Sequence, residues 1–140
     1  MNLKIKSNML IGLFGLLKLL IHLFTNTNYG LHRDEFLYFD EGKHLAWGFM
    51  EVPPLTPFFG KIADLLGGSV FAIRLFPALI GVATVILAGY LVKSLGGKNR
   101  AIAVTCLALV FTPALLGSDS LFQPVGFIRF FWFLSALFLV

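Results

Sequence analysis

Two adjacent carboxylates, Asp34 and Glu35, are the side chains whose types and spacing best suit acid–base chemistry in this sequence. They follow a histidine and an arginine in the segment HRDE, close to the end of a strongly apolar stretch. A carboxylate at the boundary between water and lipid is partly desolvated, and its neighbours can tune it to accept a proton. This pair could therefore hold a general base that acts on a lipid-borne substrate. The alternative is a solvated connecting loop whose charges only keep it soluble.

The composition of the chain indicates a membrane protein. Of the 140 residues, 58% are hydrophobic and only 13% are charged, which is far from the average of soluble proteins. Apolar windows of a length that suits membrane-crossing helices predict spans at about residues 7–25, 71–92, 101–117 and 127–140. These windows predict an all-α polytopic membrane protein in which residues 1–140 form one transmembrane domain. Because the last window stops at the end of the chain, we expect this domain to be the N-terminal portion of a larger protein.

The distribution of lysine and arginine predicts the orientation in the membrane. Lys4 and Lys6 precede the first span, and three further basic residues crowd residues 93–100. Since basic residues favour the cytoplasmic side, we expect a multi-pass protein of the cytoplasmic membrane with a cytoplasmic N-terminus and an outer loop at residues 26–70. The net charge of +4 follows from this topology, so we expect contact with membrane lipids and no nucleic-acid partner.

The outer loop is expected to contain two surface helices. Residues 34–49 combine acids in the first turn with aromatic side chains that suit an interface, and Pro53 and Pro54 would end this helix. Residues 55–68 could form a second short helix that Gly67 and Gly68 close.

The sequence resembles a known family in three stretches. They are YGLHRDEFLYFDEGKHLAWGFMEVPPLTP at residues 29–57, RLFPALIGVATVILAGYLVKSLGG at 74–97 and LFQPVGFIRFFWFL at 121–134. In combination they are similar to the start of a bacterial family 39 glycosyltransferase of the dolichyl-phosphate-mannose protein mannosyltransferase type. The similarity is strongest to the subgroup related to aminoarabinose transferase.

This resemblance implies a C-type glycosyltransferase fold, in which many transmembrane helices support a first outer loop with surface helices and the catalytic acid. Such enzymes move a sugar from a polyprenyl-phosphate donor to an acceptor at the outer face of the cytoplasmic membrane. The implied partners are a polyprenyl-phosphate-linked sugar and a lipid or protein acceptor. As an N-terminal portion, the chain is expected to be inactive alone.

The resemblance also implies roles for individual residues. Asp34 would be the catalytic base that takes a proton from the acceptor, with Glu35 as the second choice. Arg74 is the favoured cation for the donor phosphate and Lys61 is the alternative. A lone arginine near the end of a span could instead extend its charge to the interface, which leaves a structural role open for Arg74.

Three further residues are candidates for lining the site: His32, Arg33 and Asp119. The first two could equally be solvated. Relatives tend to have an aspartate where this chain has Ile128, and Asp119 could replace it, cap a helix or be solvated. No cofactor is expected. Paired carboxylates could hold a divalent metal, but no D-x-D run is present for a nucleotide diphosphate, so a metal-free reaction is favoured.

Lys18 and His22 lie on one face of the first predicted span, four residues apart. We expect them to pack against other helices, with Lys18 close enough to the outer end for its charge to reach the interface. Two other functional classes remain open. One is a transporter or flippase subunit in which Lys18, His22 and Arg74 line a path, and the other is a small structural membrane protein.

Overall fold

The structure is a computed structural model that describes residues 6–50 and 52–140 of the chain. Over these residues it contains helices and no strands, so the expected all-α fold is confirmed. The helices are α1 (Ser7–Thr25), α2 (Arg33–Lys43), α3 (Leu55–Leu65), α4 (Val70–Ser94), α5 (Asn99–Phe111), α6 (Pro113–Ser120) and α7 (Pro124–Phe138).

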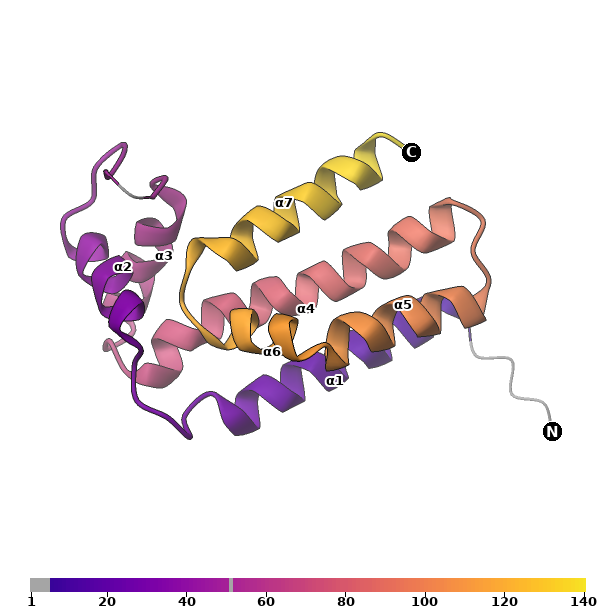
Figure 1. The fold of residues 1–140 in the computed structure, drawn as a ribbon, viewed down its shortest axis with the longest axis horizontal. Helices are drawn as coiled ribbons and strands as arrows, with labels where there is room; N and C mark the ends of the chain where they lie inside the picture. The colour runs from indigo at the N-terminus through magenta and orange to yellow at the C-terminus, as the bar shows by residue number, and fades with distance from the viewer. Residues whose placement is uncertain (1–5, 51) are drawn as a thin grey trace.

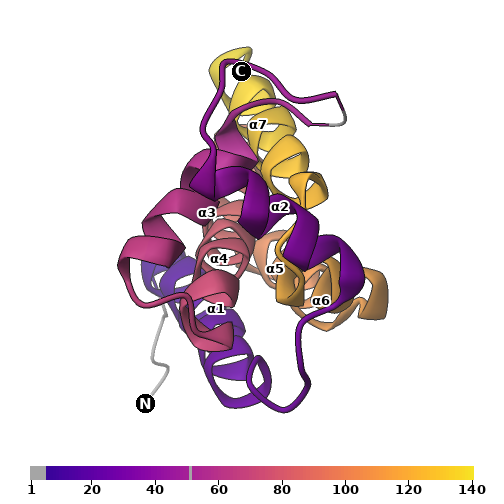
Figure 2. The same cartoon turned by 90° about the vertical axis from the view of Figure 1, so that its left-hand side faces the viewer.

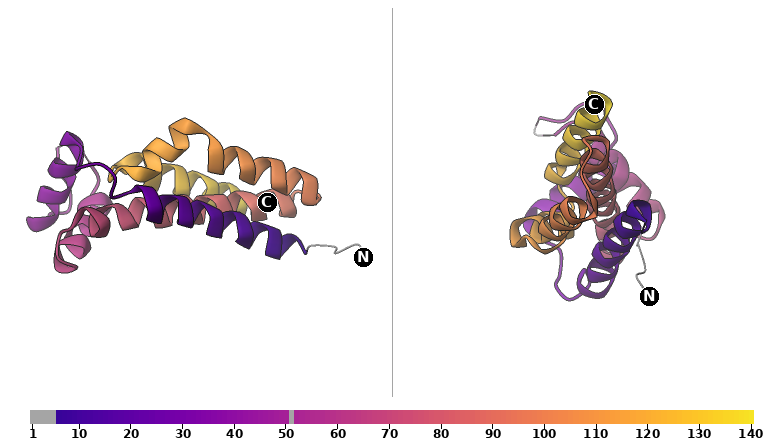
Figure 3. Two further views of the ribbon diagram at one scale, coloured as in Figure 1. Left: turned by 90° about the horizontal axis from the view of Figure 1, so that it is seen from below. Right: turned by 90° about the vertical axis from the view of Figure 1, so that its right-hand side faces the viewer.

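The long helices form a bundle that the two short loop helices cover at one end. Helices α1, α4, α5 and α7 run alongside one another, while α2 and α3 lie beyond the end of the bundle where α4 begins (Figure 1). Figure 2 looks onto that end, with α2 and α3 in front of the bundle. Helix α4 packs against α1, α5, α6 and α7, and α1 and α7 lie on different sides of it (Figure 3). We call the end covered by α2 and α3 the loop end.

Among the described residues, two helices are long and apolar enough to cross a membrane: α1, with 19 residues, and α4, with 25. Helices α5 and α6 together make a third candidate, although they are bent by 58°. The window at residues 101–117 suggested one continuous helix, but Pro113 lacks a backbone N–H and keeps the preceding Thr112 extended. Helix α7 is shorter, at 15 residues. The chain is thus a multi-pass membrane protein.

Close packing of α1 on α4 depends on small residues. A Cβ atom on Gly89 would lie 2.8 Å from Cγ1 of Ile11, and one on Gly15 would lie 3.0 Å from Cγ1 of Ile86. Small side chains at such positions let two helix backbones approach closely and so increase their van der Waals contact. This contact matters in a membrane because the hydrophobic effect does not drive helices together in lipid. The α1–α4 pair is therefore closely packed along the bundle.

The loop helices differ from expectation in one respect. Helix α2 ends at Lys43, so residues 44–50 and 52–54, which lie between α2 and α3, are not helical, and Trp47 is one of them. Gly42 favours this early end because glycine is a poor helix former and because α3 crosses here: a Cβ on Gly42 would lie 2.7 Å from the Gly60 carbonyl carbon. Helix α3 is closed as expected, by positive φ angles at Gly67 (97°) and Gly68 (61°).

The charges at the opposite end of the bundle agree with the sequence pattern. Lys6 precedes α1, and Lys93 lies in the last turn of α4, where it donates a 2.8 Å hydrogen bond to Oδ1 of Asn8. Lys4 lies outside the described residues. The basic residues that predict the cytoplasmic side thus lie away from the loop end.

Candidate functional site

The start of α2 is fixed by a capping box. The backbone N–H of His32 donates to Oε2 of Glu35 at 2.8 Å, and the Asp34 N–H donates to Nδ1 of His32 at 3.4 Å. These contacts satisfy backbone donors that would otherwise lack partners at a helix N-terminus. Asp34 and Glu35 are therefore the second and third helical residues, and they point in different directions.

Asp34 is the accessible member of the pair. Its side chain is 44% exposed and is flanked by Nε of Arg33 at 3.2 Å and Nδ1 of His32 at 3.8 Å. His32 and Arg33 are also exposed, so all three can meet a ligand from outside the bundle. The capping role of the His32 ring is one that sequence reasoning did not assign.

Glu35 is buried and committed to structural contacts. Arg74 donates to both of its oxygens, at 3.0 Å from Nε and 2.7 Å from Nη2, and the backbone N–H of Phe122 donates to Oε1 at 2.9 Å. Burial by itself raises the pKa of the Glu35 carboxyl, but hydrogen bonds from Arg74, His32 and Phe122 outweigh it and the net shift is downward. An ionised, fully bonded carboxylate is poorly placed to serve as a base.

Arg74 is likewise occupied by the protein. Besides Glu35, it donates to the carbonyl oxygens of Asn26 (2.7 Å), Tyr29 (3.0 Å) and Gly30 (2.7 Å). A guanidinium has five N–H donors, and each of them has an acceptor here. Arg74 is 4% exposed, so it does not reach out to the interface but joins α4 to the segment before α2.

The lowered pKa of Glu35 predicts a loss of stability in acid. A carboxyl whose pKa is lower in the folded protein adds stability above its unfolded pKa, about 4.3 for glutamate, and loses it as the pH falls through the lower folded value. We expect hydrogen exchange of α2 backbone amides to accelerate as the pH falls below about 4, after correction for the intrinsic pH dependence of exchange. Glu35→Gln should lack this acid step; an identical step in that variant would contradict the assignment.

A groove opens beside the start of α2, with a volume of about 410 Å³. Its lining comes from the end of α1 and the segment that follows it, from α4, and from the end of α6 and the residue after it: Thr25, Asn26, Tyr29, Gly30, Leu31, His32, Arg74, Ser120 and Leu121. We call it the His32 groove. Asp34 is not part of the lining, but its contact with the His32 ring places it at the edge.

Lys61 lies on α3 and retains donor capacity. Its side chain is 36% exposed, and Nζ donates to Oδ2 of Asp64 at 3.3 Å. An ammonium has three donors, so Lys61 can bind a further acceptor. Within the described residues, no hydrogen bond or ion pair joins Lys61 to Asp34. The structure thus brings Glu35 and Arg74 together, whereas Lys61 lies on a separate helix.

Asp119 lies inside the bundle, at the end of α6, and is neither solvated nor on an outer loop. Its Oδ2 is 2.9 Å from Nζ of Lys18, and its Oδ1 accepts from Nη2 of Arg129. Lys18 is fully buried, so the expectation that its charge reaches the interface is wrong and the expectation that it packs against other helices is correct. Sequence reasoning missed this cluster, although the cost of Lys18 in lipid was the signal that a partner exists.

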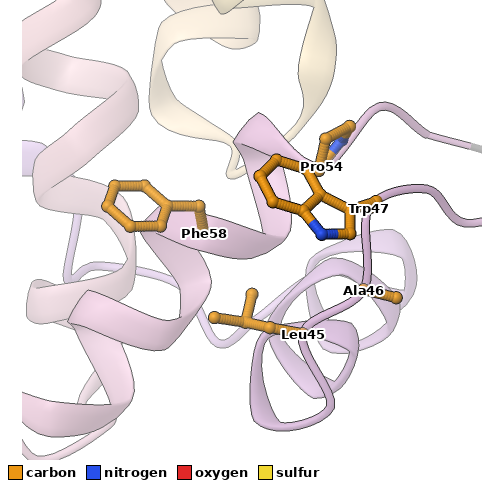
Figure 4. A pocket seen from close by; sticks show the side chains of 5 residues that line it. All are labelled: Leu45, Ala46, Trp47, Pro54 and Phe58. Carbon is orange, nitrogen blue, oxygen red and sulfur yellow. The ribbon is translucent and has the colours of Figure 1, made fainter.

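A second hollow, of about 250 Å³, lies in the connection between α2 and α3. Leu45, Ala46, Trp47, Pro54 and Phe58 line it, and Figure 4 shows the indole of Trp47 beside Pro54. None of these side chains is ionisable, so this hollow suits an apolar group and offers no acid–base chemistry.

The described residues contain no group of three or more His, Cys, Asp or Glu side chains that could hold a metal ion. In particular, both oxygens of Glu35 face Arg74 and backbone donors, so Asp34 and Glu35 do not form a paired ligand set. The metal-free reaction remains a prediction.

The fold and these groups define a multi-pass membrane protein with an accessible carboxylate at one end of its bundle. The family model described as dolichyl-phosphate-mannose-protein mannosyltransferase matches residues 51–140, and the chain belongs to this family. Comparison with curated proteins and with solved structures gave no match. The family is one of glycosyltransferases of the mannosyltransferase type, which confirms that part of the resemblance. The HRDE segment precedes the matched residues.

Proposed function

We propose that this protein transfers a sugar from a polyprenyl-phosphate donor to an acceptor at the outer face of the cytoplasmic membrane, with Asp34 as the base. One observation carries the proposal: Asp34 is an exposed carboxylate at the edge of a groove, while its neighbour Glu35 is held by Arg74. The two adjacent acids thus have different tasks.

The proposed reaction requires little beyond a base and a cation. The bond between the anomeric carbon and the phosphate oxygen breaks, and its electron pair leaves with the phosphate. The acceptor oxygen forms a new bond to that carbon from the opposite face, and its proton passes to Asp34. Such a displacement inverts the anomeric configuration. Positive charge near the phosphate stabilises the leaving group.

Lys61 is the better candidate for that positive charge. It keeps free donor capacity at a partly exposed position, whereas every N–H of Arg74 already has a protein acceptor. In this proposal Arg74 positions the segment before α2, and His32 and Arg33 border the acceptor. Asp119 has no direct part in the reaction.

Orientation and partners follow from the same proposal. The loop end lies opposite Lys6 and Lys93, so the rule that places basic residues inside would put α2 and the His32 groove outside. The family description names a dolichyl-phosphate-mannose donor and a protein acceptor. A mannose donor with a protein acceptor is therefore the pair to test first, and an aminoarabinose donor with a lipid acceptor is the second.

The test is a transfer assay in right-side-out membrane vesicles, with the complete reading frame expressed, including any sequence that follows Val140. Labelled polyprenyl-phosphate mannose is added in one arm and labelled polyprenyl-phosphate aminoarabinose in a second arm, and label is counted in protein and lipid fractions. We expect label in one fraction, in inverted configuration. Absence of transfer with both donors, in vesicles that retain the protein, would refute the proposal. The same assay on the 140-residue chain tests the expectation that it is inactive alone.

A further inference from the structure

We propose that the buried ion pairs of Lys18, Asp119 and Arg129 position the start of α2, and with it the carboxylate of Asp34. We call these three residues the buried charge cluster. The proposal deepens the proposed function because it concerns the same base. It assigns a positioning task to residues that lie inside the bundle and do not line the His32 groove.

The buried charge cluster joins three helices at one carboxylate. Lys18 of α1 and Arg129 of α7 both bind Asp119 at the end of α6, and Nη1 of Arg129 also donates to Oγ of Ser118 at 2.8 Å. The side chains of Lys18, Asp119 and Arg129 are 0%, 3% and 16% exposed. Charges buried to this degree are tolerated only when paired, so the end of α6 is held in one place.

A second set of polar contacts reinforces this position. Oγ of Ser120 lies 3.4 Å from Nδ1 of His22, which is 3.2 Å from Oδ1 of Asn26. The amide of Asn26 donates in turn to the backbone oxygen of Arg74 at 3.2 Å. The last turn of α6 is thus connected through α1 to α4, the helix that carries the partner of Glu35.

The cluster reaches α2 through the short link after α6. Three residues beyond Asp119, the backbone N–H of Phe122 donates to Oε1 of Glu35 at 2.9 Å. The Phe122 ring is fully buried in a core with Ala63, Ile73 and Phe127, so the link has little freedom to adjust. Because Glu35 also caps α2, a shift of Asp119 is transmitted to the helix turn that carries Asp34.

The charge balance makes the proposal specific. Two cations share one carboxylate, so loss of Asp119 leaves both without their anion, whereas loss of the Lys18 charge leaves Asp119 paired with Arg129. Breaking a buried pair by removing one partner is strongly destabilising because it leaves an uncompensated charge. Asp119→Asn should therefore be more damaging than Lys18→Met, and Lys18→Met should partly rescue Asp119→Asn.

Gly81 offers a way to move Asp119 without changing any charge. A Cβ atom at Gly81 of α4 would lie 2.7 Å from both Cγ and Oδ2 of Asp119, a distance that real contacts do not show. Gly81→Ala must therefore displace the carboxylate. The matched control is Gly117→Ala in α6, where an added Cβ meets nothing within 4 Å.

The test measures hydrogen exchange of residues 33–43 in lipid nanodiscs, together with that of residues 113–122. We expect Asp119→Asn and Gly81→Ala to speed exchange in both segments by 10-fold or more, corresponding to a loss of about 1.4 kcal/mol or more. Lys18→Met and Gly117→Ala should change residues 33–43 by less than 3-fold. The double variant Lys18→Met/Asp119→Asn should lie between Asp119→Asn and the wild type.

A result confined to residues 113–122 would overturn the proposal, because the cluster would then hold α6 without positioning α2. If Asp119→Asn does not fold, the exchange of residues 33–43 in Gly81→Ala and in Lys18→Met/Asp119→Asn tests the proposal in its place. A second readout is transfer by the complete reading frame: kcat should fall for Gly81→Ala while the KM for the donor stays unchanged. Hydrogen exchange can be measured in a protein that transfers no sugar. Absence of transfer by the wild type would therefore refute the proposed function without affecting the test of the buried charge cluster.

Discussion

Asp34→Asn is expected to lower the rate of sugar transfer by about 10²- to 10⁴-fold, the usual contribution of a positioned general base. Asparagine has nearly the same shape as aspartate but cannot accept the proton of the acceptor. Asp34 contacts only the exposed side chains of Arg33 and His32 among the interactions described, so the fold should persist. The measurement is kcat in vesicles that contain the complete reading frame, with donor binding determined separately.

The matched control for this variant is Asp40→Asn. Asp40 lies on the same helix, its side chain is 67% exposed, and it pairs with Lys43. Transfer should stay within about 2-fold of the wild type in this control, because exposed ion pairs contribute little. If Asp34→Asn transfers sugar as fast as Asp40→Asn, Asp34 is not the base. Loss of donor binding in Asp34→Asn would instead assign Asp34 to recognition.

Arg74→Met is expected to destabilise the loop end by roughly 3–5 kcal/mol, the usual cost of removing one partner from a buried ion pair. The change leaves the Glu35 carboxylate buried without its cation, and three backbone carbonyls lose a donor. Thermal unfolding in detergent should show a lower midpoint, and exchange of α2 amides should rise. The double variant Arg74→Met/Glu35→Gln should be less damaged than Arg74→Met because it contains no unpaired charge.

Arg33→Met is the control, since Arg33 is 90% exposed and the same atoms are removed. Its effect on stability should stay within about 0.5 kcal/mol. The comparison also separates two roles of Arg74. An unchanged midpoint combined with weaker donor binding in Arg74→Met would restore Arg74 as the phosphate-binding cation, in place of Lys61.

Some features of the protein were determined by local sequence. The span predicted at residues 7–25 coincides with α1, and the span predicted at 71–92 covers most of α4. Such segments are recognisable because a membrane-crossing helix satisfies its own backbone hydrogen bonds and needs only an apolar surface of sufficient length. The closure of α3 by Gly67 and Gly68 was equally predictable, because it depends on backbone freedom at single residues.

The tertiary structure decided which carboxylate is exposed and which is buried in an ion pair. Asp34 and Glu35 are equivalent carboxylates in the sequence, and Arg74 follows Glu35 by 39 positions, so no local pattern shows that these two pair. Lys18 and Asp119 are further apart still, on α1 and α6. Burial of a charge is decided by helices that meet in space, because a lone charge in a bundle is costly and a paired one is tolerated. Local sequence therefore determined where the helices form, and the packing of distant helices determined which acids are buried in ion pairs and which remain accessible.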